Sequence, residues 1–402
     1  MNKRYLIWDT PFSAIIFLVA AILVVGSINV LSASAANALI NYESGMRFFF
    51  RYLGYALSGI FLAGLVCYIG YKRLLQPLVA WLFYAVVLGM LVYVQLFGES
   101  VNGAARWIYI GSLSLQPSEF AKLAIIMLCA TNLAYYINRG KAPSLIKGVG
   151  LQLLVVTTIY GVFVMRQPDM GTASIIMALM LFCFIIAGMR WRHVIYTGIT
   201  AIVGVIIMIA AAPYRLNRIM IWLDPWKDAE RTGYQMVQSQ VAVGSGGLLG
   251  TTWGQGTGKL FYLPEAHTDF AFAIFCQENG FIGAIGLIIL FTLLLGAMLC
   301  ITIKAKDPRG YIVSAGVTLL IVGQAAANMA MVCGLLPVIG IPLVFISYGG
   351  SSMWTSMLAL GLILSVYLEE TKEQQLEENS TAEDRRHNLH FTSHSEGRWE
   401  HE

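Results

Sequence analysis

The chain of 402 residues is 57% hydrophobic and only 12% charged, about half the charged fraction of a typical soluble domain. Its mean hydropathy is +0.69. This composition excludes a soluble enzyme, a disordered chain and a fibrous protein, because so much apolar surface needs lipid as its solvent. A net charge of only +4 gives no reason to expect nucleic acid as a partner.

Ten apolar stretches are long enough to cross a bilayer as helices, which takes about 20 residues each. The alternating segments typical of a transmembrane barrel do not occur in the sequence. Small residues that resemble a signal-peptidase site follow the first stretch, but it is longer than a signal-peptide core, so we expect it to be retained. The sequence predicts an all-α polytopic membrane protein with a ten-helix membrane domain over 1–368 and spans at 12–33, 48–70, 74–97, 118–137, 147–165, 171–189, 193–212, 270–303, 311–334 and 352–368.

Lysine and arginine residues gather in the connections on the N-terminal side of this predicted bundle. Such a bias marks the cytoplasmic side of a membrane protein. We therefore expect a multi-pass membrane protein with both termini in the cytoplasm. The long connection 213–269 then forms one large extracytoplasmic loop. The chain over 369–402 is polar and lacks apolar periodicity, and we expect it to be a disordered cytoplasmic tail.

The loop 213–269 is far longer than the other connections, and long loops in compact proteins are usually functional. It opens with Arg215, and a glycine-rich stretch precedes Lys259. This stretch does not match the nucleotide-binding pattern GxxxxGK[ST], because Leu260 follows the lysine. Glycine-rich backbone beside a lysine can still hold an anion, although a flexible loop explains the composition slightly better.

Asp269 is the best candidate for acid–base chemistry on the outer side, since it stands where the polar loop meets an apolar helix. Burial there would raise the pKa of its carboxyl toward that of a useful base. Thr268 or Asp269 could instead cap a helix that starts at residue 270, and the two roles are compatible. Glu265, His267 and Asp269 alternate along the chain and could instead bind a divalent ion, which is a weak signal.

A second group of polar residues lies over 102–122. Pro117 is typical of a helix start, and Glu119 and Lys122 are then three residues apart on one helical face. Ionisable groups inside a membrane usually line a cavity, whereas the alternative is a structural ion pair near the helix end. Arg106 precedes this helix, and Asp169, in a similar strip, is expected to act as a helix cap.

The residues of these stretches resemble a known family, the FtsW/RodA/SpoVE or SEDS proteins. The resemblance runs from about residue 10 to 368, and WLDPW and YLPEAHTDF lean toward its division-type (FtsW) members. One departure is Ala105, where the family has the first of two arginines; the second maps to Arg106. The motifs that carry the resemblance, in order, are NGAARW, QPSEFAKL, QPDMGTA, WLDPW, GYQMVQSQ, YLPEAHTDFAFA and FISYGGSS.

The resemblance implies a SEDS fold and a peptidoglycan glycosyltransferase that polymerises lipid II into β-1,4 glycan strands at the outer face of the bacterial cytoplasmic membrane. The family's essential acid maps to Asp269, which we assign as the base of an inverting transfer. A divalent cation such as Mg²⁺ or Mn²⁺ could assist, but the sequence does not fix one. Further substrate-binding candidates, several of them cations for the pyrophosphate, are Arg106, Glu119, Lys122, Arg215, Lys259, Glu265 and His267.

The resemblance also implies a partner, a class B penicillin-binding protein with one membrane helix, among other membrane proteins of a division or elongation complex. Two alternatives stay open. A lipid II flippase or transporter would use Glu119 and Lys122 as gating charges, and a non-catalytic division scaffold would use its helices to dock partners. A transporter should carry charges along both halves of its path, yet the acids cluster on the outer side. A scaffold has no need for Asp269.

Overall fold

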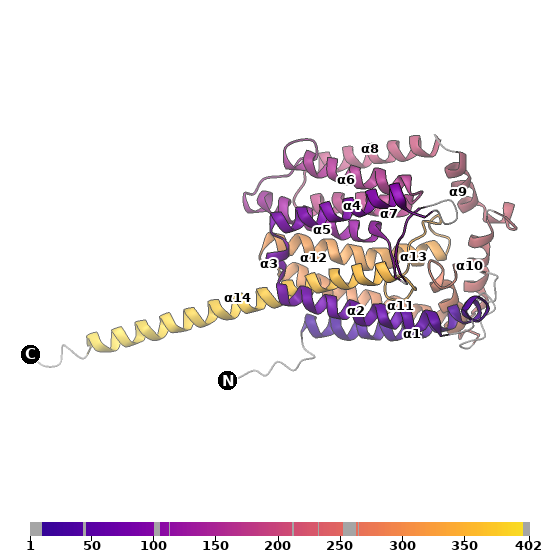
Figure 1. Ribbon diagram of the computed structural model, residues 1–402. Coiled ribbons are helices and arrows are strands. Elements are labelled where there is room, and N and C mark those ends of the chain that lie inside the picture. The colour runs from indigo at the N-terminus through magenta and orange to yellow at the C-terminus, as the bar shows by residue number, and fades with distance from the viewer. Residues whose placement is uncertain are drawn as a thin grey trace, which may run out of the picture.

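The computed structural model describes residues 10–42, 46–99, 105–111, 113–210, 213–231, 233–251, 263 and 265–396. Figure 1 shows long helices that run side by side, with short helices across one end. We call the end that carries α9 and α10 the loop end, and the end from which α14 projects the tail end. The elements are α1 (Pro11–Tyr42), α2 (Arg47–Ile69), α3 (Tyr71–Leu74), α4 (Pro77–Phe97), β1 (Ile108–Ile110), β2 (Leu113–Leu115), α5 (Pro117–Asn138), α6 (Val149–Arg166), α7 (Met170–Ile186), α8 (Trp191–Ala210), α9 (Pro213–Leu223), η2 (Pro225–Asp228), α10 (Tyr234–Ser245), α11 (Ala271–Lys304), α12 (Pro308–Thr318), η4 (Leu319–Gly323), α13 (Gln324–Val332) and α14 (Gly350–Glu396).

The predicted membrane-spanning architecture is confirmed. In the described part of the chain, eight helices are long and apolar enough to cross a membrane, and α7 is a shorter apolar helix. Each of the ten expected spans falls on a helix, with α8 as the seventh and the run α12–η4–α13 as the ninth. Large apolar side chains such as Phe17, Leu57 and Phe61 are exposed on these helices, as expected where the surrounding solvent is lipid.

Helix α5 lies at the centre of the bundle, in contact with α4, α6, α7, α12 and α14. It begins at Pro117, as predicted, because the fixed φ of proline suits the first position of a helix and its missing N–H is not needed there. An antiparallel hairpin leads into it, with Tyr109 of β1 opposite Ser114 of β2. The polar residues in the first turns of α5 therefore lie inside the protein at the loop end.

Helix α11 is broken at Gly280, whose φ of 64° and ψ of −167° are open only to glycine. The break frees backbone N–H groups that a continuous helix would use. The N–H of Phe281 donates to the carbonyl of Gly247 at 2.9 Å, and that of Ile282 donates to Leu248 at 3.2 Å. The segment after α10 is thereby tied to α11, the helix that follows Asp269.

The expectation of a disordered tail from residue 369 is wrong as far as Glu396, because α14 continues to that residue. The segment is rich in glutamate, glutamine, lysine and arginine, which are good helix formers even without apolar periodicity. It is also anchored at its start, where Glu373 pairs with Lys72 and Glu370 accepts the backbone N–H of Lys306 at 3.0 Å. The helix therefore projects beyond the tail end of the bundle (Figure 1).

Candidate active site

Asp269 lies in the turn that leads into α11, at the junction of the long connection and the apolar helix. The alternative role as a helix cap is wrong: α11 begins at Ala271 with Phe270 at the capping position, and no side chain of the described residues caps it. The hydroxyl of Thr268, the other capping candidate, instead donates to Glu265 Oε2 at 2.7 Å. The Asp269 carboxyl is therefore not committed to holding the helix start.

The irregular strip over 334–349, which joins α13 to α14, packs against this turn. The N–H of Tyr348 donates to the carbonyl of His267 at 2.8 Å. The ring of His267 lies 4.9 Å from that of Phe48 on α2. The strip thus covers one side of the turn, and the ring contact between His267 and Phe48 packs the turn against α2.

The electrostatic surroundings of Asp269 raise its pKa to about 7. Burial is the largest cause, because it disfavours the charged carboxylate. The negative charges of Glu265 and Asp169 raise the pKa further, while the positive charge of Arg106 partly opposes them. A carboxyl with a pKa near neutrality is suited to accept a proton from a hydroxyl group at physiological pH.

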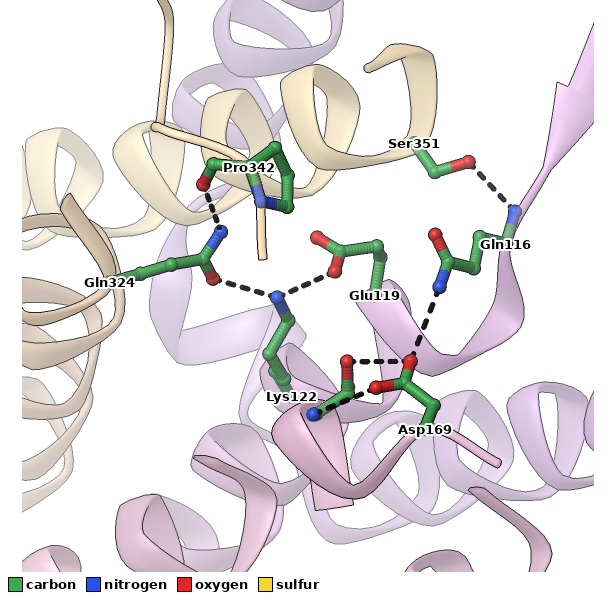
Figure 2. Close-up of polar contacts among 8 residues, drawn as sticks. Gln116, Glu119, Lys122, Asp169, Gln324, Pro342 and Ser351 are labelled. Atoms are coloured by element: carbon green, nitrogen blue, oxygen red, sulfur yellow. Dashed lines mark hydrogen bonds and ion pairs between the residues drawn. The ribbon is translucent and has the colours of Figure 1, made fainter. Parts of the chain in front are cut away.

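Glu119 and Lys122 form a buried ion pair at the start of α5. Lys122 Nζ lies 2.7 Å from Glu119 Oε1, and the two side chains are only 1% and 5% exposed. The same ammonium donates to Gln324 Oε1 at 2.7 Å (Figure 2). Two of the three N–H donors of the lysine thus have partners, and the pair connects α5 to α13. Whether it also lines a substrate cavity stays a prediction.

Asp169 acts as the cap of α7, as predicted. Its Oδ1 accepts the backbone N–H of Thr172 at 3.1 Å, and its Oδ2 accepts the hydroxyl of the same residue at 2.8 Å. Figure 2 shows the Asp169 carboxyl joined to Gln116, whose Nε2 lies 3.5 Å from Oδ2. The charge of Asp169 acts on Asp269, a second role that the sequence pattern did not indicate.

Arg106 holds the turn that presents Asp169. Its Nε donates to the carbonyl of Gln167 at 2.8 Å, and its Nη2 donates to that of Pro168 at 2.7 Å. These two bonds use part of the five-donor guanidinium and leave the rest available. The arginine is therefore fixed near Asp269 by backbone contacts, with its charge close enough to lower the pKa of that carboxyl.

The alternating triplet Glu265, His267 and Asp269 does not form a metal site. Within the described residues, no three His, Cys, Asp or Glu side chains are grouped so that they could hold an ion. Glu265 is exposed and binds Thr268, while His267 is partly buried and its pKa is lowered by that burial. These residues do not fit a resident Mg²⁺ or Mn²⁺ ion.

Two predicted phosphate-binding cations cannot be placed relative to this site. Arg215 lies on α9 at the loop end, but its side chain is outside what the structure describes, and Lys259 lies outside the described residues altogether. Two amide side chains that contact the site from α13, Gln324 and Asn328, were not predicted from the sequence. The available signal was a pair of polar residues one turn apart inside an otherwise apolar span.

The sequence is similar to a known protein family over most of its length. A family model for FtsW, RodA and SpoVE, described as "Cell cycle protein", matches residues 13–372. A relative from Trichlorobacter lovleyi, named "Probable peptidoglycan glycosyltransferase FtsW", is 37% identical over 353 residues, which is 88% of this chain and 92% of the relative. Stage V sporulation protein E of Bacillus subtilis is 35% identical over 360 residues, 89% of this chain and 97% of the relative.

Solved structures resemble the fold over the same extent. A chain from "Structural coordination of polymerization and crosslinking by a peptidoglycan synthase complex" matches with a TM-score of 0.74 and 27% identity, covering 89% of this chain and 97% of the other. The rod shape determining protein RodA of Thermus thermophilus matches with a TM-score of 0.64 and 26% identity, covering 89% and 96%. With a family model that matches most of its length, the chain belongs to the FtsW/RodA/SpoVE family of cell cycle proteins.

Proposed function

We propose that the protein is a peptidoglycan glycosyltransferase that polymerises lipid II into β-1,4 glycan strands. The observation that carries the proposal is the partly buried Asp269 carboxyl, with a pKa raised to about 7, in a site bordered by the buried pair Glu119–Lys122. Relatives that are named peptidoglycan glycosyltransferases support the same activity.

The proposed reaction needs one base and one set of positive charges. In lipid II the donor sugar is α-linked to pyrophosphate, and the product bond is β, so a single displacement inverts the anomeric carbon. The oxygen of the acceptor 4-hydroxyl bonds to the anomeric carbon while Asp269 accepts the proton of that hydroxyl. The bond between the carbon and the pyrophosphate breaks at the same time, and its electron pair leaves with the pyrophosphate. Cations stabilise the departing pyrophosphate; Arg106 and Lys122 are the described candidates, with Arg215 and Lys259 as candidates elsewhere on the chain.

We further propose that the loop end faces outward from the cytoplasmic membrane and that both termini are cytoplasmic. Helix α1 begins and α14 leaves the bundle at the same end (Figure 1), and that tail end carries basic residues such as Lys72 and Lys306. Basic residues in short connections favour the cytoplasmic side. The proposed partner is a class B penicillin-binding protein, supported by the resemblance to a chain of a peptidoglycan synthase complex.

The decisive experiment supplies purified protein with lipid II, alone and together with a class B penicillin-binding protein whose own activity is blocked by a β-lactam. Glycan strands resolved by gel electrophoresis, absent with the Asp269→Asn variant, are the expected result. Transfer of intact lipid II between the leaflets of a vesicle without any polymer would contradict the proposal and favour a flippase. Absence of both activities in the complex would favour a scaffold.

A further inference from the structure

Two buried amide side chains lie one turn apart on α13. Gln324 is 4% exposed and Asn328 is fully buried. Residues four apart on a helix share a face, so both amides point to the same side of α13. Burying an amide inside a membrane protein is costly unless it is hydrogen-bonded. Both ends of the Gln324 amide and the Nδ2 group of Asn328 find partners in the candidate active site.

Gln324 holds the ammonium of the buried ion pair. Its Oε1 accepts from Lys122 Nζ at 2.7 Å, and its Nε2 donates to the carbonyl of Pro342 at 3.2 Å (Figure 2). Lys122 is a flexible side chain, and Glu119 alone fixes only one of its N–H groups. The second bond, from a helix that is itself tied to the 334–349 strip, fixes the direction of the ammonium.

Asn328 holds the backbone of the proposed base. Its Nδ2 donates to the carbonyl of Asp269 at 2.8 Å and to that of Ile341 at 2.7 Å. Ile341 and Pro342 are consecutive, so the two amides of α13 bind adjacent carbonyls of one strip. One face of α13 therefore contacts both the proposed base and Lys122, and it is held in place by the carbonyls of Ile341 and Pro342.

The helical turn before α13 determines the direction in which the face that carries Gln324 and Asn328 points. Leu319–Gly323 forms a π-helical turn, η4, between α12 and α13. One extra residue in a turn rotates the following helix by about 100° relative to a continuous α-helix. The π turn thus brings residues 324 and 328 to face α5 and the Asp269 turn, and such turns are frequent at functional sites.

We propose that Gln324 and Asn328 are positioning residues for glycosyl transfer, Gln324 acting through Lys122 and Asn328 through Asp269. The inference rests on the proposed function for its chemistry, although the contacts themselves do not. A base works only within hydrogen-bond reach of the hydroxyl that it deprotonates, and a misplacement of about 1 Å can cost on the order of 100-fold in rate.

The first test compares the kinetics of Asn328→Leu and Gln324→Leu with those of a matched control. Thr318→Val is the control, because Thr318 is also buried and its hydroxyl donates to the backbone carbonyl of Ser314 on its own helix at 2.7 Å. We expect each leucine variant to lower kcat at least 10-fold, with KM for lipid II within 3-fold of the wild type. Gln324→Glu, which keeps an acceptor for Lys122, should recover part of the lost rate.

The second test uses pH and separates the two amides. Among the described residues, the charges of Glu265, Asp169, Glu119 and Arg106 act on the pKa of Asp269, and none of these residues is altered in the variants. Releasing the Asp269 backbone lets its carboxyl reach water, so the basic group that controls kcat should titrate at lower pH in Asn328→Leu. Gln324→Leu should leave that titration in place.

The melting temperature of the detergent-solubilised protein provides a readout that does not depend on lipid II. In the wild type it should fall as pH rises through the range in which only the unfolded chain has lost the Asp269 proton. This fall should be smaller in Asn328→Leu and unchanged in Gln324→Leu and Thr318→Val. If wild-type protein polymerises nothing but this difference is present, the proposed function fails and the positioning of Asp269 by Asn328 stands.

The inference is overturned if Asn328→Leu and Gln324→Leu lose activity only in proportion to their folded fraction, as Thr318→Val does. It is also overturned if Asn328→Leu keeps the wild-type pH dependence of both kcat and melting temperature. Should a leucine variant fail to fold, Asn328→Ala and Gln324→Ala, which remove the amide without adding bulk, are measured in its place against the same criteria.

Discussion

Gly340 lies directly against the carboxyl group of Asp269: a Cβ atom at position 340 would stand 3.5 Å from Oδ2. The φ of Gly340 is +68°, a conformation in which a side chain would be strained. A Cβ atom at that distance would make an ordinary van der Waals contact, so the positive φ, and not a lack of space, is what favours glycine at this position. The strip therefore lies beside the carboxyl, whose burial is the largest cause of its raised pKa.

Asp269→Asn should fold, insert and bind its partner but make no glycan polymer. The amide keeps the shape of the carboxyl but cannot accept a proton from a sugar hydroxyl. Loss of a general base typically costs about 10²- to 10⁴-fold in rate, which a gel of glycan strands would register as no product. Glu265→Gln and His267→Ala should retain measurable activity. Polymerisation by Asp269→Asn at near the wild-type rate would refute the assignment.

The polymerisation rate should rise with pH through about 7, the pKa of the Asp269 carboxyl, because only the carboxylate accepts a proton. The negative charge of Glu265 contributes to that raised pKa. Glu265→Gln should therefore move the rising limb of the rate profile to lower pH. Initial rates between pH 5 and 9 measure this, and an unmoved limb would show that Asp269 does not set it.

The raised pKa of Asp269 also makes the stability of the fold depend on pH. The pKa of Asp269 is raised from its ordinary value of 3.8, so the folded protein keeps this proton at pH values where the unfolded chain has lost it. The contribution to the free energy of unfolding is greatest below about pH 4 and declines as pH rises to about 7. Asp269→Asn should remove this decline, which thermal unfolding in detergent across that range would detect.

Glu119→Gln should destabilise the protein by about 3–5 kcal/mol, because it leaves the Lys122 ammonium buried without its counter-charge. The double variant Glu119→Gln/Lys122→Met should recover most of the stability, since an apolar side chain can replace a buried charge without loss. If the pair serves the reaction, the double variant should be folded and inactive. A stable double variant with the wild-type polymerisation rate would reduce the pair to a structural role.

Gly280→Ala should loosen the segment after α10 from α11. A Cβ at this position would overlap the backbone N of Gly250 and the carbonyl of Leu248, and the φ/ψ pair itself would cost an alanine about 1–3 kcal/mol. Proteolysis at residues 245–251 should become faster while the rest of the bundle resists. Gly286→Ala, at a helical glycine with open space around it, is the control and should be cut like the wild type.

A cysteine at Ser245 should react with a membrane-impermeant maleimide added to intact spheroplasts. Ser245 is exposed at the end of α10, on the side that we propose faces outward. The exposed native cysteines, Cys300 and Cys333, must first be replaced by alanine. Labelling only after the membrane is permeabilised would show that the proposed orientation is inverted.

Apolar stretches of the sequence predicted every membrane helix, because a span in lipid leaves a signal about 20 residues long. The position of Asp269 at the junction of loop and helix could be predicted for the same reason. The roles of Gln324 and Asn328 could not, since they depend on a π turn that rotates α13 and on carbonyls in an irregular strip. The tail was misjudged because a helix that projects from a protein needs no apolar face.

Helix α14 starts at Gly350, two residues after Tyr348, whose N–H binds the turn that carries Asp269. It then continues without interruption through the bundle and past the tail end, where it pairs with Lys72. At 1.5 Å per residue, its 47 residues make a rod about 70 Å long. One continuous helix therefore joins the strip beside the proposed base to the segment that projects from the opposite end of the bundle.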